Sequence, residues 1–382
     1  MFSFMHLADC GLKNLPYGGI NPETGLNRRF EDVEKNFSFC VATAIKNKCK
    51  YFVIAGDINE ERNPESLLIE RFSSHVADLI SEGIRVIIVA GNHDVDSSKG
   101  TSTSISFLKS LGLLDTYISD LRPSRFEFSD VVFHCVPYMF PHQVMRETND
   151  EVSEWLKTYI NGVKLSPDKK NILVTHYSLE TTFYGLGVDE PVLDIDCLSR
   201  FDYVALGHIH KYEMFSSFTG GYTGSMFTKD FGEENMKFVN HVVVGHDVHI
   251  KKVQIPERRF IQIDIDGVGV SNTDLMDILS GELDKRNVSG CVLKVRVKAK
   301  KRFNPKIVYA MLKNAGVFHY VPIDWKIDTN QKVKKLTTGD GVVGDVDIVD
   351  GYYKQKPDNI DTRDYVIDTI GKWDDVFLGI EK

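Results

Sequence analysis

Short apolar runs alternate with amphipathic segments through about the first 255 residues of the chain. The apolar runs have the length of buried strands and cover residues 4–7, 51–55, 85–90, 131–136, 171–175 and 203–206. Between them, apolar residues recur at helical spacing over residues 30–46, 65–80 and 151–160. This alternation predicts an α/β fold in which helices cover the sheets.

The pattern changes from about Tyr222 to strands and tight turns. Residues 238–244 and 248–253 flank the sequence Gly-His-Asp and predict a hairpin. Pro256 marks the predicted boundary between a first domain, residues 1–255, and a second, residues 256–330. The second predicts a small α+β domain, with strands near 260–265 and 291–298 and helices near 274–285 and 306–314.

The last part of the chain, residues 331–382, is predicted to be a linker followed by a partner-binding segment. Residues 331–350 are polar and rich in glycine, which is typical of a linker or a hairpin. Residues 362–378 carry a weak apolar stripe, which consists of Tyr365, Val366, Ile370, Trp373 and Phe377. A terminal amphipathic segment behind a linker often docks on another surface. Its own domain and another chain are both candidates.

The composition excludes several classes of protein. With 42% hydrophobic and 26% charged residues, it is that of an ordinary globular protein. The apolar start lacks the features of a signal peptide, and no apolar run approaches the roughly 18 residues of a membrane span. The six cysteines form no CxxC pair, which favours a reducing cytoplasm over a zinc ribbon or a disulfide framework. A net charge of −8 means that a nucleic-acid ligand would need local basic surface or metal ions.

Five of the apolar runs end in polar residues of the kinds that bind metals. These residues are Asp9, Asp57, Asn92 with His93 and Asp94, His176, and His208 with His210. Ligands beyond the carboxyl ends of strands are expected to converge on one edge of a sheet. A mixed set of Asp, Asn and His suits manganese, iron or zinc. A single Gly-Asp is common in turns, and a lone histidine after a strand is usually a core residue, but five clusters in this order favour a metal site.

These motifs resemble those of the calcineurin-like metallophosphoesterases, whose order is Asp-x-His, Gly-Asp, Gly-Asn-His-Asp/Glu, a lone His, and Gly-His-x-His. The chain shows ADCG, GD, GNHD, TH and GHIH over residues 9–210. It is more narrowly similar to the nuclease subunit of SbcCD-type complexes and its phage relatives. That resemblance rests on GLNRRFEDV, on GYTGSMFTKDFGEEN after GHIH, and on a second unit placed where that family has its capping domain. It implies a four-layer α/β/β/α sandwich with a smaller α+β capping domain.

The resemblance also implies a role for each motif residue. Asp57 would bridge two metal ions. Asn92, His176 and His208 would complete one metal site, and Asp9 and His210 would serve the other. His93 would lie beside the scissile phosphate, and Asp94 would orient His93 by a hydrogen bond. Two ions roughly 3.5–4 Å apart can activate a water molecule and stabilise an in-line displacement at phosphorus.

The chain departs from the family pattern at Gly11. The family has a histidine ligand at this position, and glycine has no side chain to offer. Cys10 and Asn14 are candidate substitutes, although Cys10 points away from Asp9 in an extended strand. Water is the expected replacement. We therefore expect two Mn²⁺ ions per chain, one of them weakly bound.

Basic residues predict two candidate DNA contacts. Residues 293–300 alternate apolar with basic side chains, namely Lys294, Arg296, Lys298 and Lys300. The strand is either a solvated edge strand protected by its charge or a surface that contacts the phosphate backbone. Arg28 and Arg29 lie close to the first motif in sequence, and they either reach a substrate phosphate or belong to the surface at a helix start.

The sequence therefore predicts a manganese-dependent DNA nuclease that acts in DNA repair or recombination. The expected partners are DNA, an SbcC-like coiled-coil ATPase and a second copy of the chain, in the cytoplasm and without a membrane. The first alternative is a phosphoesterase that acts on a small molecule or a phosphoprotein. The second is a scaffold without activity, which only Gly11 supports.

Overall fold

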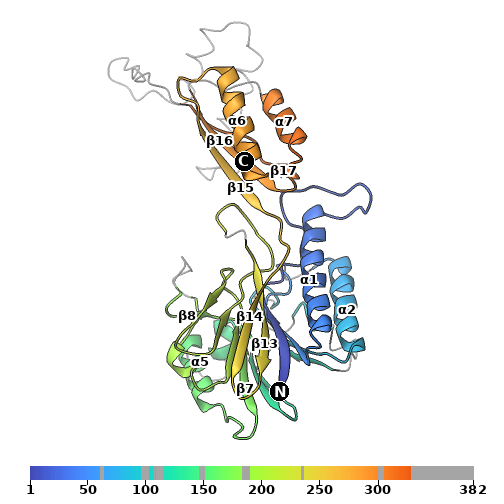
Figure 1. Cartoon of the computed structure of the whole chain (residues 1–382). Helices are drawn as coiled ribbons and strands as arrows, with labels where there is room; N and C mark the ends of the chain where they lie inside the picture. Colours follow the sequence, from blue (N-terminus) through green and yellow to red (C-terminus); the bar gives the residue numbers. More distant parts are fainter. Residues whose placement is uncertain are drawn as a thin grey trace, which may run out of the picture. The chain divides into compact units, whose positions relative to one another are not determined.

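The computed structural model describes residues 1–60, 64–95, 103–106, 108, 115–145, 151–182, 190–233, 236–299 and 305–327. Residues Met1–Lys326 form one compact unit (Figure 1). The domain boundary at Pro256 stays a prediction. Lys300 and residues 331–382, with their apolar stripe, lie outside the described residues.

The first sheet has the strand order β14-β13-β1-β2-β3-β4. Strands β1 to β4 are parallel to one another, and the hairpin β13-β14 joins antiparallel to β1. The strands are β1 (Phe2–Leu7), β2 (Tyr51–Ala55), β3 (Arg85–Val89), β4 (Thr116–Ser119), β13 (Phe238–Val244) and β14 (Val248–Gln254). The predicted strands and hairpin of this sheet are therefore present, and β4 is additional.

The second sheet has the strand order β11-β12-β10-β7-β6-β5. Its inner strands β12, β10, β7 and β6 are parallel, and its outermost strands are antiparallel to their neighbours. The strands are β5 (Ser124–Glu127), β6 (Val131–Val136), β7 (Lys170–Thr175), β10 (Tyr203–Leu206), β11 (Glu213–Met214) and β12 (Gly220–Tyr222). A separate pair is formed by β8 (Ser178–Leu179) and β9 (Val192–Leu193).

The two sheets face each other across an aromatic core. The ring of Phe4 in β1 contacts Phe133 of β6 and Tyr203 of β10, with ring centroids 6.3 and 5.4 Å apart. On the other face of the first sheet, Phe52 and Ile54 pack with α1 (Arg28–Lys46) and α2 (Ser66–Ser81), which lie side by side (Figure 1). The outer face of the second sheet packs against α4 (Pro141–Met145), α5 (Val152–Gly162) and η1 (Ile195–Cys197). This is the predicted α/β/β/α sandwich.

The C-terminal part of the described chain is a small α+β unit with its own core. It consists of β15 (Phe260–Asp266), α6 (Asn272–Arg286), β16 (Val292–Ala299), α7 (Pro305–Asn314), β17 (His319–Tyr320) and β18 (Asp324–Ile327). Strand β16 pairs with β15 along its length and also with β17 and β18. The interpretation of this basic strand as an edge strand was therefore wrong. Its alternation is as predicted, because Val295 and Val297 are buried while Arg296 is partly exposed.

Candidate metal centre

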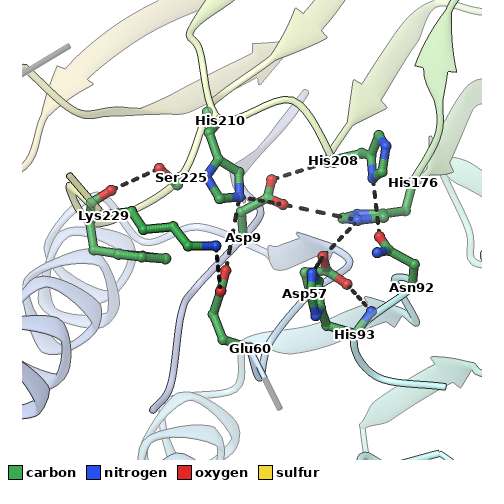
Figure 2. Close-up of polar contacts among 12 residues, drawn as sticks. Asp9, Asp57, Glu60, Asn92, His93, His176, His208, His210, Ser225 and Lys229 are labelled. Atoms are coloured by element: carbon green, nitrogen blue, oxygen red, sulfur yellow. Dashed lines mark hydrogen bonds and ion pairs between the residues drawn. The ribbon is translucent and has the colours of Figure 1, made fainter. Parts of the chain in front are cut away.

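The motif residues come together where strands of both sheets end. Asp9 and Asp57 follow β1 and β2, and Asn92 follows β3, all in the first sheet, while His176 and His208 follow β7 and β10 of the second (Figure 2). The expectation that one edge of one sheet carries them all was therefore wrong. The site lies where the ends of two packed sheets adjoin, since parallel strands of both sheets run toward it.

The loops after β1 and β2 continue side by side into the site. The backbone N–H groups of Asp9, Cys10 and Leu12 donate to the carbonyls of Gly56, Asp57 and Ile58, at 3.0, 2.8 and 3.0 Å. Asp9 and Asp57 both adopt φ of +49° and His208 adopts +96°, conformations that are costly for residues other than glycine. Gly91 leaves room for Asp57, because a Cβ at position 91 would lie 2.1 Å from Asp57 Oδ1.

One half of the site is formed by Asp57, Asn92, His176 and His208. Asp57 Oδ2 lies 3.2 Å from His176 Nε2, and Asn92 Oδ1 lies 3.1 Å from His208 Nδ1. The other ring nitrogen of His176 donates to the carbonyl of Ala55 at 2.7 Å, and that of His208 donates to Glu190. In the neutral imidazoles, His176 Nε2 and His208 Nδ1 therefore carry lone pairs that face oxygen atoms. A cation shared by these nitrogens and oxygens satisfies the arrangement.

The other half contains Asp9 and His210. Asp9 Oδ1 lies 3.8 Å from His210 Nε2 and 4.0 Å from His176 Nε2, and it is completely buried. Asp9, Asp57 and His176 each present a ligand atom within 4.8 Å of the other two. Among the described residues, neither Asp9 Oδ1 nor His176 Nε2 has a hydrogen-bond partner. Buried polar atoms without partners are rare and costly, so these two atoms fit a metal ion.

The electrostatics of the protein alone also indicate a cation site. Burial lowers the pKa of His176, but the carboxylates of Asp57 and Asp9 more than compensate and raise it to about 9. Burial raises the pKa of Asp9, because no fixed positive charge offsets its desolvation fully. The buried carboxylates thus favour a positive charge on the fully buried His176. A metal ion bound beside these carboxylates would supply positive charge at the same place.

Two carboxylates outside the motifs each accept a hydrogen bond from one ring nitrogen of His208 or His210. Glu190 accepts from His208 Nε2, and Glu233 accepts from His210 Nδ1 at 3.2 Å. Carboxylates in this position orient a metal-binding histidine and increase its basicity. The sequence analysis missed both residues. Glu233 belongs to the GEEN sequence that supported the nuclease resemblance, whereas Glu190 carried no signal.

His93 and Asp94 lie next to each other but differ in exposure and role. The backbone N–H of His93 donates to Asp57 Oδ1 at 2.9 Å, and its side chain is 41% exposed. Asp94 is completely buried and accepts from the backbone N–H groups of Gly91, Ile58 and Asn59 at 3.0–3.3 Å. The expected hydrogen bond between the Asp94 carboxylate and His93 is thus replaced by bonds that join the loops after β2 and β3. Asp94 holds the backbone on either side of the site.

At Gly11 the structure explains why no side chain is present. Gly11 has φ of +70°, and a Cβ there would lie 2.0 Å from Cε1 of Phe227. Cys10 is buried in the core, where burial raises the pKa of its thiol well above the ordinary value. Asn14 donates to Glu65 at 2.8 Å. Neither candidate substitute therefore offers a ligand to the site.

The basic candidates for DNA contact have different surroundings. The Arg29 side chain is wholly buried and binds Asp32, Glu257 and the carbonyl of Thr228, each at 2.9–3.0 Å. This corrects the expectation that Arg29 reaches a substrate phosphate, because its guanidinium already has charged partners away from solvent. Arg28 is half-buried, with its guanidinium carbon 6.0 Å from the ring centroid of Phe318.

On β16, Arg296 forms an ion pair with Asp264, and Lys298 is exposed. The Lys294 ammonium lies 5.9 Å from the ring centroid of Phe231.

Comparisons with known proteins agree with the fold. Residues 2–212 match the family model of the calcineurin-like phosphoesterases. The chain therefore belongs to this family, whose members are metal-dependent hydrolases.

Among characterised proteins, the chain is 26% identical over 273 residues to the DNA double-strand break repair protein Mre11 of Methanocaldococcus jannaschii, covering 69% of each chain. It is 25% identical over 275 residues to the Mre11 protein of Aeropyrum pernix, covering 69% of this chain and 63% of that one. A dimetal phosphatase from Danio rerio is 13% identical in sequence, with a TM-score of 0.40 over 66% of this chain and 96% of its own. No helix among the described residues is long and apolar enough to cross a membrane.

Proposed function

We propose that this protein is a two-metal DNA nuclease that uses manganese. The observation that carries the proposal is the pair of buried, unpartnered ligand atoms Asp9 Oδ1 and His176 Nε2, within a set of Asp, Asn and His donors. Such a donor set suits manganese, iron or zinc better than calcium or magnesium, which prefer oxygen ligands alone. The similarity to Mre11 proteins supports DNA as the substrate.

The proposed ligand assignment follows from the two halves of the site. Asn92, His176 and His208 would hold one ion, Asp9 and His210 would hold the other, and Asp57 would serve both. Bound ions would supply the positive charge that activates a water molecule and neutralises the phosphodiester. The partly exposed ring of His93 lies with Nε2 4.0 Å from Asp57 Oδ2, and from there it can donate a proton to the leaving oxygen or stabilise charge on the phosphate. Asp94 acts indirectly, by holding the loops that carry Asp57 and Asn92.

We assign contact with the DNA backbone to the basic side chains of β16, together with Arg28. Lys294, Arg296 and Lys298 alternate with buried residues and so project from one face of the strand, and Lys300 continues the sequence pattern. The ion pair with Asp264 reduces the charge that Arg296 can offer. Lys294 is therefore a stronger candidate than Arg296.

A cleavage assay tests the proposed activity. Linear DNA should be hydrolysed with manganese, less with magnesium, and not after chelation. His93→Ala should lower the rate about 10²–10⁴-fold, the usual contribution of an acid–base group, while metal content stays the same. A variant that cuts DNA at the normal rate would show that His93 has no such role.

If the protein is instead a phosphoesterase of small molecules or phosphoproteins, it should hydrolyse a small phosphomonoester faster than DNA. A small phosphomonoester and a phosphodiester can be compared at equal metal concentration. Faster hydrolysis of the monoester, with intact DNA, would replace the nuclease proposal by a phosphatase. Bound metal with no hydrolysis of either substrate would support a scaffold without activity.

The proposed partner is an SbcC-like coiled-coil ATPase that binds the C-terminal segment. The support is the apolar stripe of residues 365–377 in the sequence together with the family resemblance, because apolar faces of this kind are usually covered. Deleting residues 355–382 should abolish partner capture and spare cleavage of short DNA. Unchanged capture would contradict the assignment. A homodimer and a cytoplasmic location remain predictions.

A further inference from the structure

We infer that Glu60 supplies the ligand that the missing histidine at position 11 would otherwise provide to the first metal ion. The inference rests on the proposed metal assignment and deepens it. Glu60 follows Asp57 by three residues in the loop after β2, and its side chain is only 2% exposed. It points toward His210, with Oε1 3.9 Å from His210 Nε2 (Figure 2).

Two of the separations between the candidate ligand atoms fit a single ion. Glu60 Oε1 lies 3.9 Å from His210 Nε2, which in turn lies 3.8 Å from Asp9 Oδ1. Ligand atoms that each lie about 2.0–2.2 Å from one ion can be at most about 4.4 Å apart, and both of these separations fall within this limit. The oxygens of Glu60 and Asp9 lie farther apart, because Asp9, His210 and Glu60 do not form a group of ligand atoms that are all within 4.8 Å of one another. Ligation by Glu60 therefore requires its side chain to move toward Asp9, and it would then give the first ion as many protein ligands as the second.

The backbone explains why Glu60 reaches this place. The loops after β1 and β2 run side by side as far as the parallel bridge between Leu12 and Asn59, so Glu60 follows beside Lys13, two residues after Gly11. Asn59 itself is held by its N–H bond to the buried Asp94 at 3.2 Å. The loop backbone is therefore fixed before any ion binds, and only the Glu60 side chain has to move for its carboxylate to serve as a ligand.

Phe227 makes a return to the family histidine unfavourable. Its ring fills the space that a side chain at position 11 would occupy, and its centroid lies 5.9 Å from that of the His210 ring. Cys10 and Asn14 are turned to the core and to Glu65, as described above. Among the described residues of this loop, Glu60 presents its Oε1 toward His210 Nε2 at 3.9 Å.

Two lysines reach the other oxygen of Glu60. Lys229 Nζ lies 3.4 Å and Lys13 Nζ 3.6 Å from Oε2, and they compensate the buried charge before metal binds. Oε1 remains on the side of His210, so ligation does not require either ion pair to break. Two positive charges nearby should nevertheless weaken cation binding. This site should therefore fill after the other, even with Glu60 as a ligand.

The test is calorimetric titration of the metal-free protein with Mn²⁺, which needs no DNA. Wild type should bind two ions. Glu60→Gln should leave the tight ion unchanged and weaken the other more than about tenfold, since even loss of an outer-shell partner costs 10–100-fold. The matched control is Glu65→Gln, which removes the same charge from the same loop and should leave both affinities unchanged. The retained tight ion shows that each variant is folded.

A second variant reports ligation directly. Glu60→Cys titrated with Cd²⁺ should develop the ultraviolet charge-transfer band of a thiolate bound to cadmium, above the wild-type signal. The inference would be overturned if Glu60→Gln kept both wild-type affinities or if Glu65→Gln weakened the second ion equally. It would also be overturned if Glu60→Cys gave no such band. If DNA is not cleaved but manganese binding depends on Glu60, the nuclease proposal fails and the ligand assignment stands. If DNA is cleaved but manganese binding does not depend on Glu60, the ligand assignment fails and the nuclease proposal stands.

Discussion

The two halves of the metal centre are built differently although they share Asp57. The half with Asn92, His176 and His208 keeps every residue of the family motifs. The half with Asp9 and His210 lacks the motif histidine, because position 11 is a glycine, and the ring of Phe227 fills the space beside it. In this half the Glu60 carboxylate lies 3.9 Å from His210 Nε2, so a residue outside the motifs places a further oxygen near the site.

The largest effects on metal binding are expected when one histidine is removed from each half of the site in turn. His208→Ala should weaken the tight ion by more than about 100-fold and abolish cleavage, because a direct ligand matters more than an outer-shell partner. His210→Ala should weaken only the second ion. Manganese titration of both variants measures this. Equal effects on both ions in either variant would show that the halves do not bind independently.

Gly11→His should destabilise the protein by about 2–5 kcal/mol. A non-glycine residue in the left-handed conformation costs roughly 1–2 kcal/mol, and forcing a side chain into filled space adds about 1–3 kcal/mol. The positive φ and the ring of Phe227 thus both oppose a histidine at this position.

Denaturant unfolding in chelator measures the loss in Gly11→His. In the double variant Gly11→His/Phe227→Ala, the histidine should add less destabilisation than it does in wild type, because the clash is absent. Strict additivity of the two substitutions would show that Phe227 is not the obstacle.

Metal addition should stabilise the protein in two steps. An ion that binds only the folded state adds about 2.7 kcal/mol when its concentration is 100 times its dissociation constant. Because the halves are unequal, thermal stability should rise once at low manganese and again at higher manganese. In Glu60→Gln the second rise should shift to higher concentration. One rise in wild type would indicate a single ion or two equal sites.

The smallest effects are expected from the outer carboxylates. Glu190→Gln should weaken the tight ion, and Glu233→Gln the second ion, each about 10–100-fold, because each carboxylate orients one histidine. Calorimetry of the two variants checks whether each effect stays in its own half. Glu233 also pairs with Lys237 at 2.9 Å, so metal-free unfolding of Glu233→Gln is the control for a general loss of stability.

The sequence predicted the strands whose ends carry the ligands, because each buried run is followed at once by its polar residues. It located β2 at residues 51–55 and β6 at residues 131–136 with the bounds that the structure has. It also predicted the outward basic residues of β16, but not that this strand pairs on both sides. Strand pairing depends on distant segments, whereas alternation is read from adjacent residues.

Local pattern by itself determined the class of fold, the family and the candidate metal-binding positions of this protein, since strand periodicity and motif order lie within short stretches of chain. Only the tertiary structure decided what surrounds those positions. Phe227 reaches Gly11 and Glu233 reaches His210 from other loops, and Arg29 is buried by Glu257, which is 228 residues away. Such contacts form where the two sheets and their loops pack together, and that packing depends on the whole chain at once.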